Sequence, residues 1–547
     1  MNTLLINLTR FGDLLQTQAA VSDLARQGRR VGVVCLENFA AAAGLLDHVE
    51  HLFPLPGAGL LAALERRRFA PPVSARAVPE NRGPSPAGER PGWTGALADL
   101  AAWKERLRAV FPPERVCNLT ATLPARLLAR FLAGNVPCDG FALDEHGFSR
   151  NGGDWAAFLQ GASAFRGMSP FNIADVFRRV AAASRGPGDP SLKRPDGDLQ
   201  ERVARRLREE APAGGKGFVA LQLGASEERR RWPAASFAAL GRRLWEEERL
   251  CPLLVGSPQE VPLAREYLSL AGHPALSLCG QTSPEELAAA LCAVRLLVTN
   301  DTGTMHLASG LDRPVLGIFL ATAQPFDTGP YRAGSCSLEP DLPCHPCPFG
   351  RDCPHDLACR QAVSPALAAD LALAFLRRGH WPAVLPRGRG RVWLSFPAAD
   401  GFLDLRSLSG HEGEDRVLWL RLLRQCLSQF LDGEEKEDPV APEPPLPLSP
   451  AFRAGVLADL ERARDLLLLL RQQGKMLLEG SPASLKDRFL LTWRRIDQIL
   501  SQNPSLGALG MLWREKGQAE GQNLPSLLVL AEGFSGLIAR LEKKIQQ

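Results

Sequence analysis

The chain has 547 residues, more than one hydrophobic core usually serves, and its 45% hydrophobic and 23% charged residues are typical of a globular protein. A formal net charge of +4 is too small at this length to indicate nucleic-acid binding. The N-terminus lacks the basic region and the long apolar stretch of a signal peptide, and we expect no run long enough to span a bilayer. Most of the 12 cysteines stand singly in apolar segments, which fits a reducing cytoplasm. These features predict a multidomain cytoplasmic protein.

The N-terminal part alternates strand and helix patterns. Apolar runs at 4–8 and 30–36 predict buried strands, and the residues at 14–26 between them predict a helix. Because this order is typical of a parallel sheet, we expect a Rossmann-like domain over residues 1–185. Residues 66–92 are dense in Pro, Arg and Gly, and they predict a mobile surface insertion.

A second alternation follows the polar stretch 186–216, which we interpret as a linker. It predicts a second Rossmann-like domain over residues 217–390. The expected strands are 217–223, 252–255, 296–299 and 315–319, and the expected helices are 233–247 and 284–293. The predicted fold class is therefore α/β, with two Rossmann-like domains that face a cleft.

The C-terminal part has a different pattern. Residues 391–450 form an extension that starts with a short strand pattern at 392–396 and ends in an acidic, Pro-rich linker at 432–450. Residues 451–547 predict a helical module, because apolar residues recur three and four positions apart. Its expected helices are 457–476, 484–501 and 524–545. We favour burial of its apolar faces in a small bundle over membrane contact, and we expect the module to be separable and to dock a protein partner or a membrane surface.

Asp13 follows the first predicted strand, in the turn that begins at Gly12. The carboxyl end of a strand in a parallel sheet is where α/β proteins place ligands and catalytic groups. A carboxylate there can act as a general base, although an Asp at the start of a helix is more often an N-cap.

Two later segments have the pattern of an anion site. Gly224-Ala225-Ser226 ends a strand, and the basic run 229–231 precedes a helix with Pro at its first turn, so amides, a hydroxyl and a guanidinium could hold a diphosphate. Residues 298–308 run from a buried strand through Asp301-Thr302-Gly303 into a helix that carries His306. The free amides of that helix could also bind an anion. Taken singly, an Arg run is usually solvated and a lone His is usually structural.

In this order and spacing the three segments resemble glycosyltransferase family 9, whose best-known members are the ADP-heptose:lipopolysaccharide heptosyltransferases. The resemblance covers roughly residues 1–380. It rests on Gly12-Asp13-Leu14-Leu15, on the segment 224–233 that ends in Trp-Pro, and on the Asp-Thr-Gly-x-x-His pattern at 301–306. It implies a GT-B fold, in which an acceptor domain and a nucleotide-sugar domain face a cleft, here with a helical C-terminal module added.

The resemblance also implies roles for individual residues. Asp13 would be the base that deprotonates the acceptor hydroxyl, and Arg10 would lie on the acceptor side. The implied donor-binding residues are Ser226 and Arg230 at the diphosphate, Glu260 at the ribose, Thr282 beside the adenine, and Asp301, Thr302, Gly303 and His306 at the sugar and diphosphate end. Since a guanidinium and a helix end would already face the leaving diphosphate, we expect no divalent metal and no other cofactor.

Some features depart from the family pattern. Arg230 stands where Lys is commoner, and the loop at 320–325 lacks the usual Gly-Pro-Thr-Asp-Pro, which leaves the sugar preference open. A cysteine cluster, Cys344, Cys347, Cys353 and Cys359, has enough ligands for a structural zinc. Its spacing is not that of paired CxxC motifs, so we favour a loop with reduced or partly paired thiols and place no metal in the reaction.

Together these features predict an inverting, metal-independent glycosyltransferase that moves a heptose or a related sugar, with ADP-heptose as the expected donor. The expected acceptor is a lipid-linked glycan of the lipopolysaccharide-core type, or another glycan, at the inner face of the cytoplasmic membrane. One alternative is a transferase that uses another sugar nucleotide on a different glycan or on protein. Another is a non-catalytic scaffold of the same fold, against which the presence of Asp13 and of the 301–306 segment argues.

Overall fold

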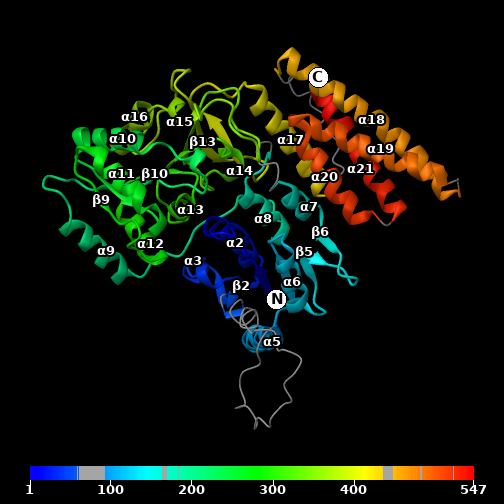
Figure 1. Cartoon of the computed structure of the whole chain (residues 1–547), viewed down its shortest axis with the longest axis horizontal. Coiled ribbons are helices and arrows are strands. Elements are labelled where there is room, and N and C mark those ends of the chain that lie inside the picture. Colours follow the sequence, from blue (N-terminus) through cyan, green and yellow to red (C-terminus); the bar gives the residue numbers. More distant parts are fainter. Residues whose placement is uncertain are drawn as a thin grey trace, which may run out of the picture.

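The chain folds into two α/β domains and a helical bundle (Figure 1). The computed structural model describes residues 1–57, 59–60, 93–162, 169–182, 184–434, 447–480, 483–521 and 523–546. In the view of Figure 1 the N-terminal domain lies at the bottom, the second domain at the upper left and the bundle at the upper right. The expected insertion at 66–92, and residues 435–446 of the expected acidic linker, lie outside the described residues.

The N-terminal domain is built on a six-stranded sheet in the order β3-β2-β1-β4-β5-β6, parallel except for the β5–β6 pair. Its strands are β1 (Asn2–Ile6), β2 (Arg30–Leu36), β3 (Val49–Leu55), β4 (Arg115–Asn118), β5 (Cys138–Leu143) and β6 (Ser149–Gly152). Its helices are α1 (Phe11–Gln16), α2 (Gln18–Arg26), α3 (Ala40–Ala43), α5 (Trp93–Val110), α6 (Leu123–Ala133), α7 (Asp154–Ala162) and α8 (Ile173–Ala182). All residues of β1 are buried, because this strand pairs with both β2 and β4.

The second domain has an eight-stranded sheet in the order β14-β13-β12-β11-β10-β7-β8-β9, parallel from β12 to β9. Its strands are β7 (Phe218–Gln222), β8 (Cys251–Val255), β9 (Leu276–Ser277), β10 (Leu297–Asn300), β11 (Val315–Ile318), β12 (Cys336–Glu339), β13 (Arg391–Pro397) and β14 (Leu403–Ser407). Its helices are α9 (Gly197–Glu209), α10 (Ala234–Glu248), α11 (Val261–Ala271), α12 (Pro284–Ala293), α13 (Gly303–Gly310), α14 (Pro325–Thr328), α15 (Cys359–Ala362) and α16 (Pro365–Arg378).

In the part of the chain that the structure describes, the bundle contains five helices: α17 (Asp415–Leu431), α18 (Pro450–Leu478), α19 (Ala483–Gln502), α20 (Gly507–Glu520) and α21 (Leu524–Gln546). It packs directly on the N-terminal domain. A Cβ at Gly161 of α7 would lie only 2.4 Å from the Met511 methyl of α20, and Lys516 pairs with Asp154 at 2.5 Å. The bundle and the N-terminal domain therefore share one hydrophobic core.

The α/β class, with two Rossmann-like domains of the GT-B type and an added helical part, is confirmed. Among the described helices that were not predicted from the sequence, three lie in the expected linker, extension and bundle. The stretch 186–216, interpreted as a linker, contains α9, in which only Leu207 is buried and charged residues obscure the apolar spacing. The extension 391–450 contains α17, and the bundle contains α20 between two of the expected helices.

Two further expectations need correction. The helix expected at 14–26 is divided at Thr17 into α1 and α2, because the buried Thr17 hydroxyl takes part in the turn after β1. By length and composition α21 could cross a membrane, with a mean hydropathy of 1.4, although no such run was expected. Its apolar residues Leu530, Phe534 and Leu537 are nevertheless buried in the bundle.

A buried ionic network joins the two α/β domains. Arg178 of α8 pairs with Asp23 of α2 at 2.7 Å and with Asp175 at 2.8 Å. Asp175 in turn accepts hydrogen bonds from the Tyr331 hydroxyl and from the backbone N–H of Leu403, both in the second domain. Since all three charges are fully buried, opening of the domains here would remove the two hydrogen bonds that Asp175 receives from the second domain.

Candidate functional site

Asn7 organises the turn that carries Asp13. The Asn7 side chain is fully buried, and its amide donates to the Thr17 hydroxyl at 2.6 Å while its carbonyl accepts from the Thr9 N–H at 3.1 Å. The Thr17 hydroxyl also donates to the Asp13 backbone carbonyl at 3.2 Å. Arg10, rather than Asp13, occupies the N-cap position of α1, and it is exposed. The turn therefore presents Asp13 from the first turn of α1, at the carboxyl edge of the sheet.

Asp13 lines a pocket of about 200 Å³ between the two α/β domains. Thr9, Asp13 and Thr120 come from the carboxyl edge of the first sheet, whereas Asp327 and Thr328 come from α14 of the second domain. The apolar part of the wall consists of Leu119, Phe141, Leu159, Ala162, Phe171, Ile173, Val176 and Phe177. A candidate base thus faces a space large enough for part of a small molecule.

Arg230 lies at the centre of the second candidate region. It is only 5% exposed. Its guanidinium is 3.0 Å from a Glu227 oxygen and 3.8 Å from an Asp301 oxygen, and its Nε donates to the Thr322 hydroxyl at 2.7 Å. The structure therefore brings Arg230 and Asp301 together, as the two motifs predicted.

Asn300, the last residue of β10, shapes the loop after β7. Its amide donates to the carbonyls of Leu223 and Gly224 at 2.8 and 3.1 Å, and its carbonyl accepts from the Trp232 N–H at 3.0 Å. The two motif segments at 224–233 and 301–306 are therefore tied to each other through one buried amide. The sequence analysis missed Asn300; its place directly before Asp301 was the available signal.

Glu260 lies against the same loop. One of its carboxylate oxygens accepts from the Gln222 amide at 2.7 Å, and the other accepts from the Ser257 N–H and hydroxyl at 2.6 and 2.9 Å. A Cβ at Gly224 would lie 1.4 Å from a Glu260 carboxylate oxygen, so a larger residue at this position would displace the Glu260 side chain. Glu260 thus lies on one side of the candidate donor site. The Gln222 side-chain oxygen also accepts a hydrogen bond from the Thr304 hydroxyl of α13 at 3.2 Å.

The N-terminus of α13 contacts α1 of the other domain. A Cβ at Gly12 would lie 3.0 Å from the Gly303 Cα, and a Cβ at Gly303 would clash with the Phe11 ring at 2.3 Å. His306 is buried, its Nε2 lies 2.9 Å from the Gln16 amide nitrogen, and burial lowers its pKa to about 3. In this structure His306 is a neutral group at the domain contact, which fits the structural alternative for this residue.

These segments can be compared with known proteins. Residues 170–357 match the family model for glycosyltransferase family 9 (heptosyltransferase). Through this segment, about a third of the chain, the protein is similar to glycosyltransferase family 9. Lipopolysaccharide heptosyltransferase 1 of Pseudomonas aeruginosa is 34% identical over 137 residues, which is 24% of this chain and 37% of that protein. Lipopolysaccharide heptosyltransferase 2 of Salmonella typhimurium is 31% identical over 94 residues, which is 16% of this chain and 27% of that protein.

The alignments to these two relatives therefore span well under half of each relative's length. A solved structure, that of the E. coli ADP-heptose lipopolysaccharide heptosyltransferase II, superposes with a TM-score of 0.48 at 15% identity. It covers 69% of this chain and 99% of that chain.

Some of the residues expected to bind the donor sugar nucleotide lie in the matched segment 170–357 but apart from the contacts of Arg230, Asn300 and Glu260. Ser226 is exposed in the loop after β7, and Thr282 is half-buried just before the N-cap of α12. Thr302 is the N-cap of α13, with its hydroxyl 3.1 Å from that of Thr299. Backbone amides at this helix start and the Arg230 guanidinium are the groups that could hold an anion.

The loop that carries Cys344, Cys347, Cys353 and Cys359 packs on the basic run at 229–231. The Phe349 ring lies 5.4 Å from the Arg230 guanidinium carbon, and Arg229 and Arg360 donate to the backbone carbonyls of Arg351 and Arg231, each at 2.9 Å. Among the described residues, no disulfide joins Cys344, Cys347, Cys353 and Cys359. In the described part of the chain, one group of potential metal ligands has its ligand atoms within 4.8 Å of one another, and it consists of Asp341, His411 and Glu414. None of the four thiols belongs to this group.

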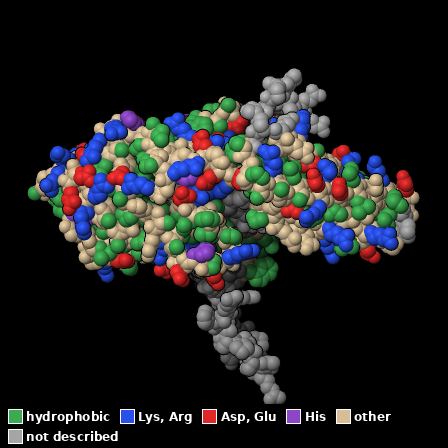
Figure 2. Space-filling model, turned by 90° about the horizontal axis from the view of Figure 1, so that it is seen from above, with side chains coloured by type: hydrophobic (Ala, Val, Ile, Leu, Met, Phe, Trp, Pro, Cys, Tyr) green, Lys and Arg blue, Asp and Glu red, His purple; other side chains and the backbone are tan. Residues whose placement is uncertain are grey.

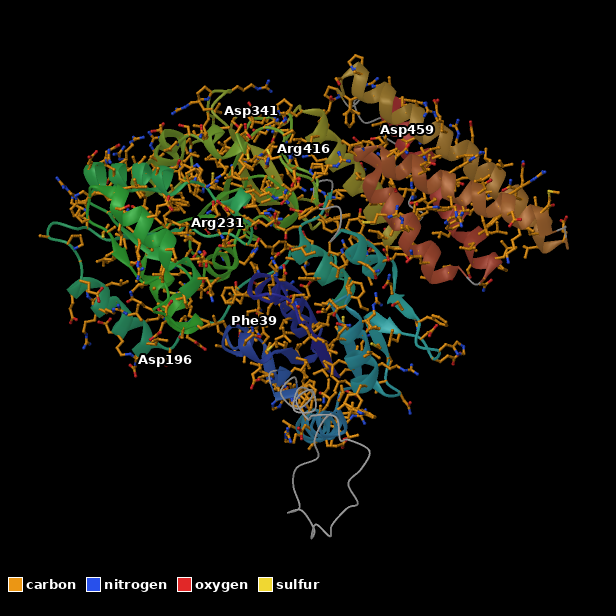
Figure 3. All side chains as sticks on the ribbon, viewed as in Figure 1. Phe39, Asp196, Arg231, Asp341, Arg416 and Asp459 are labelled. Carbon is orange, nitrogen blue, oxygen red and sulfur yellow. The ribbon has the colours of Figure 1, made fainter. Side chains whose placement is uncertain are left out.

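The first bundle helix also reaches the pocket region. Arg416 of α17 lies at the junction of the second domain and the bundle (Figure 3), where it pairs with Glu339 at 2.9 Å and donates to the Gln324 side chain at 2.8 Å. Burial alone would raise the pKa of Glu339, but Arg416 and His345 outweigh it and lower the pKa to about 2. Gln324 is the N-cap of α14. Arg416 therefore contacts the start of the helix whose residues Asp327 and Thr328 line the pocket.

Proposed function

We propose that this chain is an inverting glycosyltransferase that moves a heptose or a related sugar from an ADP-sugar to an acceptor hydroxyl. The observation that carries the proposal is the contact between the two motif regions. Gly12, next to Asp13, touches Gly303 at the start of α13, while Asp301 approaches Arg230. In this proposal a base on one domain and cationic and dipolar groups on the other act on the two ends of the transferred sugar.

In this proposal Asp13 removes the proton of the acceptor hydroxyl as that oxygen attacks the anomeric carbon. The bond from the anomeric carbon to the diphosphate oxygen breaks, and the diphosphate takes the electron pair. Arg230 and the amides at the start of α13 stabilise the negative charge that develops there. Glu260 would accept hydrogen bonds from the ribose, and Thr282 would lie near the base of the nucleotide.

No divalent metal is required by these roles, because a guanidinium and a helix end already face the leaving group. Sugar transfer should therefore persist after exhaustive chelation with EDTA. Loss of turnover that magnesium or manganese restores would contradict the metal-independent mechanism. Proton NMR of the product, compared with the donor, would show whether the anomeric configuration is inverted.

The similarity to lipopolysaccharide heptosyltransferases supports a glycan acceptor of the lipopolysaccharide-core type, with the enzyme on the cytoplasmic side of the membrane. Figure 2 shows basic and acidic side chains interspersed on the face that it presents. The apolar wall of the pocket favours a second candidate, a transferase of the same mechanism with a different acceptor. A screen of nucleotide sugars by thermal shift, followed by transfer assays with core and non-core acceptors, separates the two candidates.

A further inference from the structure

We propose that the pocket beside Asp13 binds a compact apolar group of the acceptor, so that the acceptor carries such a group within a few bonds of the hydroxyl that receives the sugar. This inference rests on the proposed function for the identity of the bound molecule as an acceptor. The binding of an apolar group in the pocket does not depend on catalysis and can be measured separately.

The wall of the pocket is built from the interior of the N-terminal domain. Phe141 is at most 1% exposed, and so is Phe171, whose ring lies 5.0 Å from that of Trp155 and 5.3 Å from that of Phe158 in edge-on arrangements. Phe177, only 3% exposed, comes from α8. These rings are fixed by their neighbours and back a preformed wall, in which Ile173 is half-buried and therefore offers apolar surface to the pocket.

The polar groups of the pocket hold the hydroxyl end in place. Thr120 is fixed by its hydroxyl, which accepts from the Leu8 N–H at 2.9 Å, and by its own N–H, which donates to Asn118 at 2.9 Å. Thr120 and Thr9 line the same space as Asp13. A molecule that offers a hydroxyl to Asp13 would therefore place its adjoining group against the aromatic wall.

The chemistry of the wall selects the adjoining group. An unsubstituted sugar presents hydroxyls on most of its edges, and those that face the apolar side of the pocket would lose water without gaining partners. An aliphatic or aromatic group instead removes apolar area from water on both surfaces. The size of the pocket sets a limit: with a volume of about 200 Å³, and about 30 Å³ for each water-sized group, it holds about six or seven carbon atoms.

Alkyl β-D-glucosides test this inference directly. We expect calorimetry with the full-length chain, at concentrations below micelle formation, to show tighter binding as the alkyl group lengthens from methyl to hexyl. The gain should be at most about fourfold per methylene, the value for full burial of a CH₂ group. It should level off beyond about six or seven carbons, because longer chains extend out of the pocket. Equal binding of the methyl and hexyl glucosides would overturn the proposal.

Three variants locate the binding. Ile173→Trp narrows the pocket at its half-buried wall residue and should abolish the dependence on chain length. Val384→Trp, at a residue that is 81% exposed and outside the pocket lining, is the matched control and should preserve it. Leu159→Ala enlarges the pocket and should move the plateau to longer chains, so the test does not depend on one variant folding. Chain-length dependence that is the same in Ile173→Trp, Leu159→Ala and the wild type would also overturn the proposal.

The two proposals fail in different ways. If the chain transfers sugar but binds methyl and hexyl glucosides equally, the inference about the pocket is wrong and the proposed function stands. If the chain binds hexyl glucoside in the pocket but transfers no sugar from any nucleotide sugar, the proposed function is wrong and the pocket assignment stands.

Discussion

Replacement of Arg230 by Ala should weaken the binding of ADP much more than the binding of adenosine. In the structure Arg230 is buried beside Asp301 and Glu227, at 3.8 and 3.0 Å, and it is the cation proposed to meet the diphosphate. A charge-assisted contact contributes about 1.5 to 3 kcal/mol, which is a loss of roughly tenfold to 150-fold in affinity. We expect the upper part of that range, because without Arg230 the carboxylates of Asp301 and Glu227 would repel the phosphates.

The assay is calorimetric titration of ADP and adenosine into the wild type and the variants. Arg229→Ala is the matched control. Arg229 is a neighbouring arginine that also pairs with Glu227, but it donates a hydrogen bond to the Arg351 carbonyl and has no proposed contact with the diphosphate. Arg230→Lys should retain part of the affinity, because a lysine keeps the charge but cannot bond Thr322 and Glu227 in the same fork. Equal losses for ADP and adenosine in Arg230→Ala would refute the assignment of Arg230 to the diphosphate.

Two further predictions concern stability and architecture. Burial lowers the pKa of His306 from 6.5 to about 3, so the unfolded chain binds a proton between these pH values that the folded chain does not. Stability should therefore fall as the pH drops below 6.5, by up to about 1.4 kcal/mol per pH unit from this group. Melting curves of His306→Gln should show a flatter dependence than the wild type between pH 6.5 and 4, and identical slopes would contradict this. The sequence predicts a separable helical module, whereas the structure predicts that truncation before Pro450 disrupts the remaining chain. The truncation would expose the apolar face of α17, including the buried Trp419, Leu423 and Leu427, and also the surface of α7 that Met511 covers. We therefore expect an insoluble or strongly destabilised product. A soluble, active truncated chain would show that the bundle is dispensable.

Local patterns in the sequence predicted much of the fold. The strand expected at 30–36 and the helix expected at 284–293 have the same bounds in the structure, because a continuous apolar run marks the first and a capping box the second. The helix α9 was missed since its surface is mostly charged, and α17 because it stands beside a Pro-rich linker. Packing of the bundle on α7 depends on the small Gly161, and no local pattern marks that residue as a contact.

The candidate site was predicted in part. Motifs gave Asp13, Arg230 and Asp301, and the structure brings the last two within 3.8 Å. The buried amides that hold the site, Asn7 and Asn300, were missed, because an amide gains its role only from partners that are distant in sequence. His306 was predicted as a donor-binding residue, but its contact with Gln16 of the other domain has no local signal in the sequence. The roles of all the predicted site residues, including Thr282 and the exposed Ser226, stay predictions.

The central claim is that Asp13 acts as the base in sugar transfer, and Asp13→Asn tests it most directly. This variant keeps the size of the side chain and the backbone contacts of the turn through Asn7 and Thr17, but it removes the proton acceptor. The measurement is turnover of a nucleotide sugar together with the dissociation constant of ADP for the same preparation. We predict a fall in turnover of about 100-fold to 10,000-fold with ADP affinity nearly unchanged. Turnover equal to that of the wild type would contradict the account.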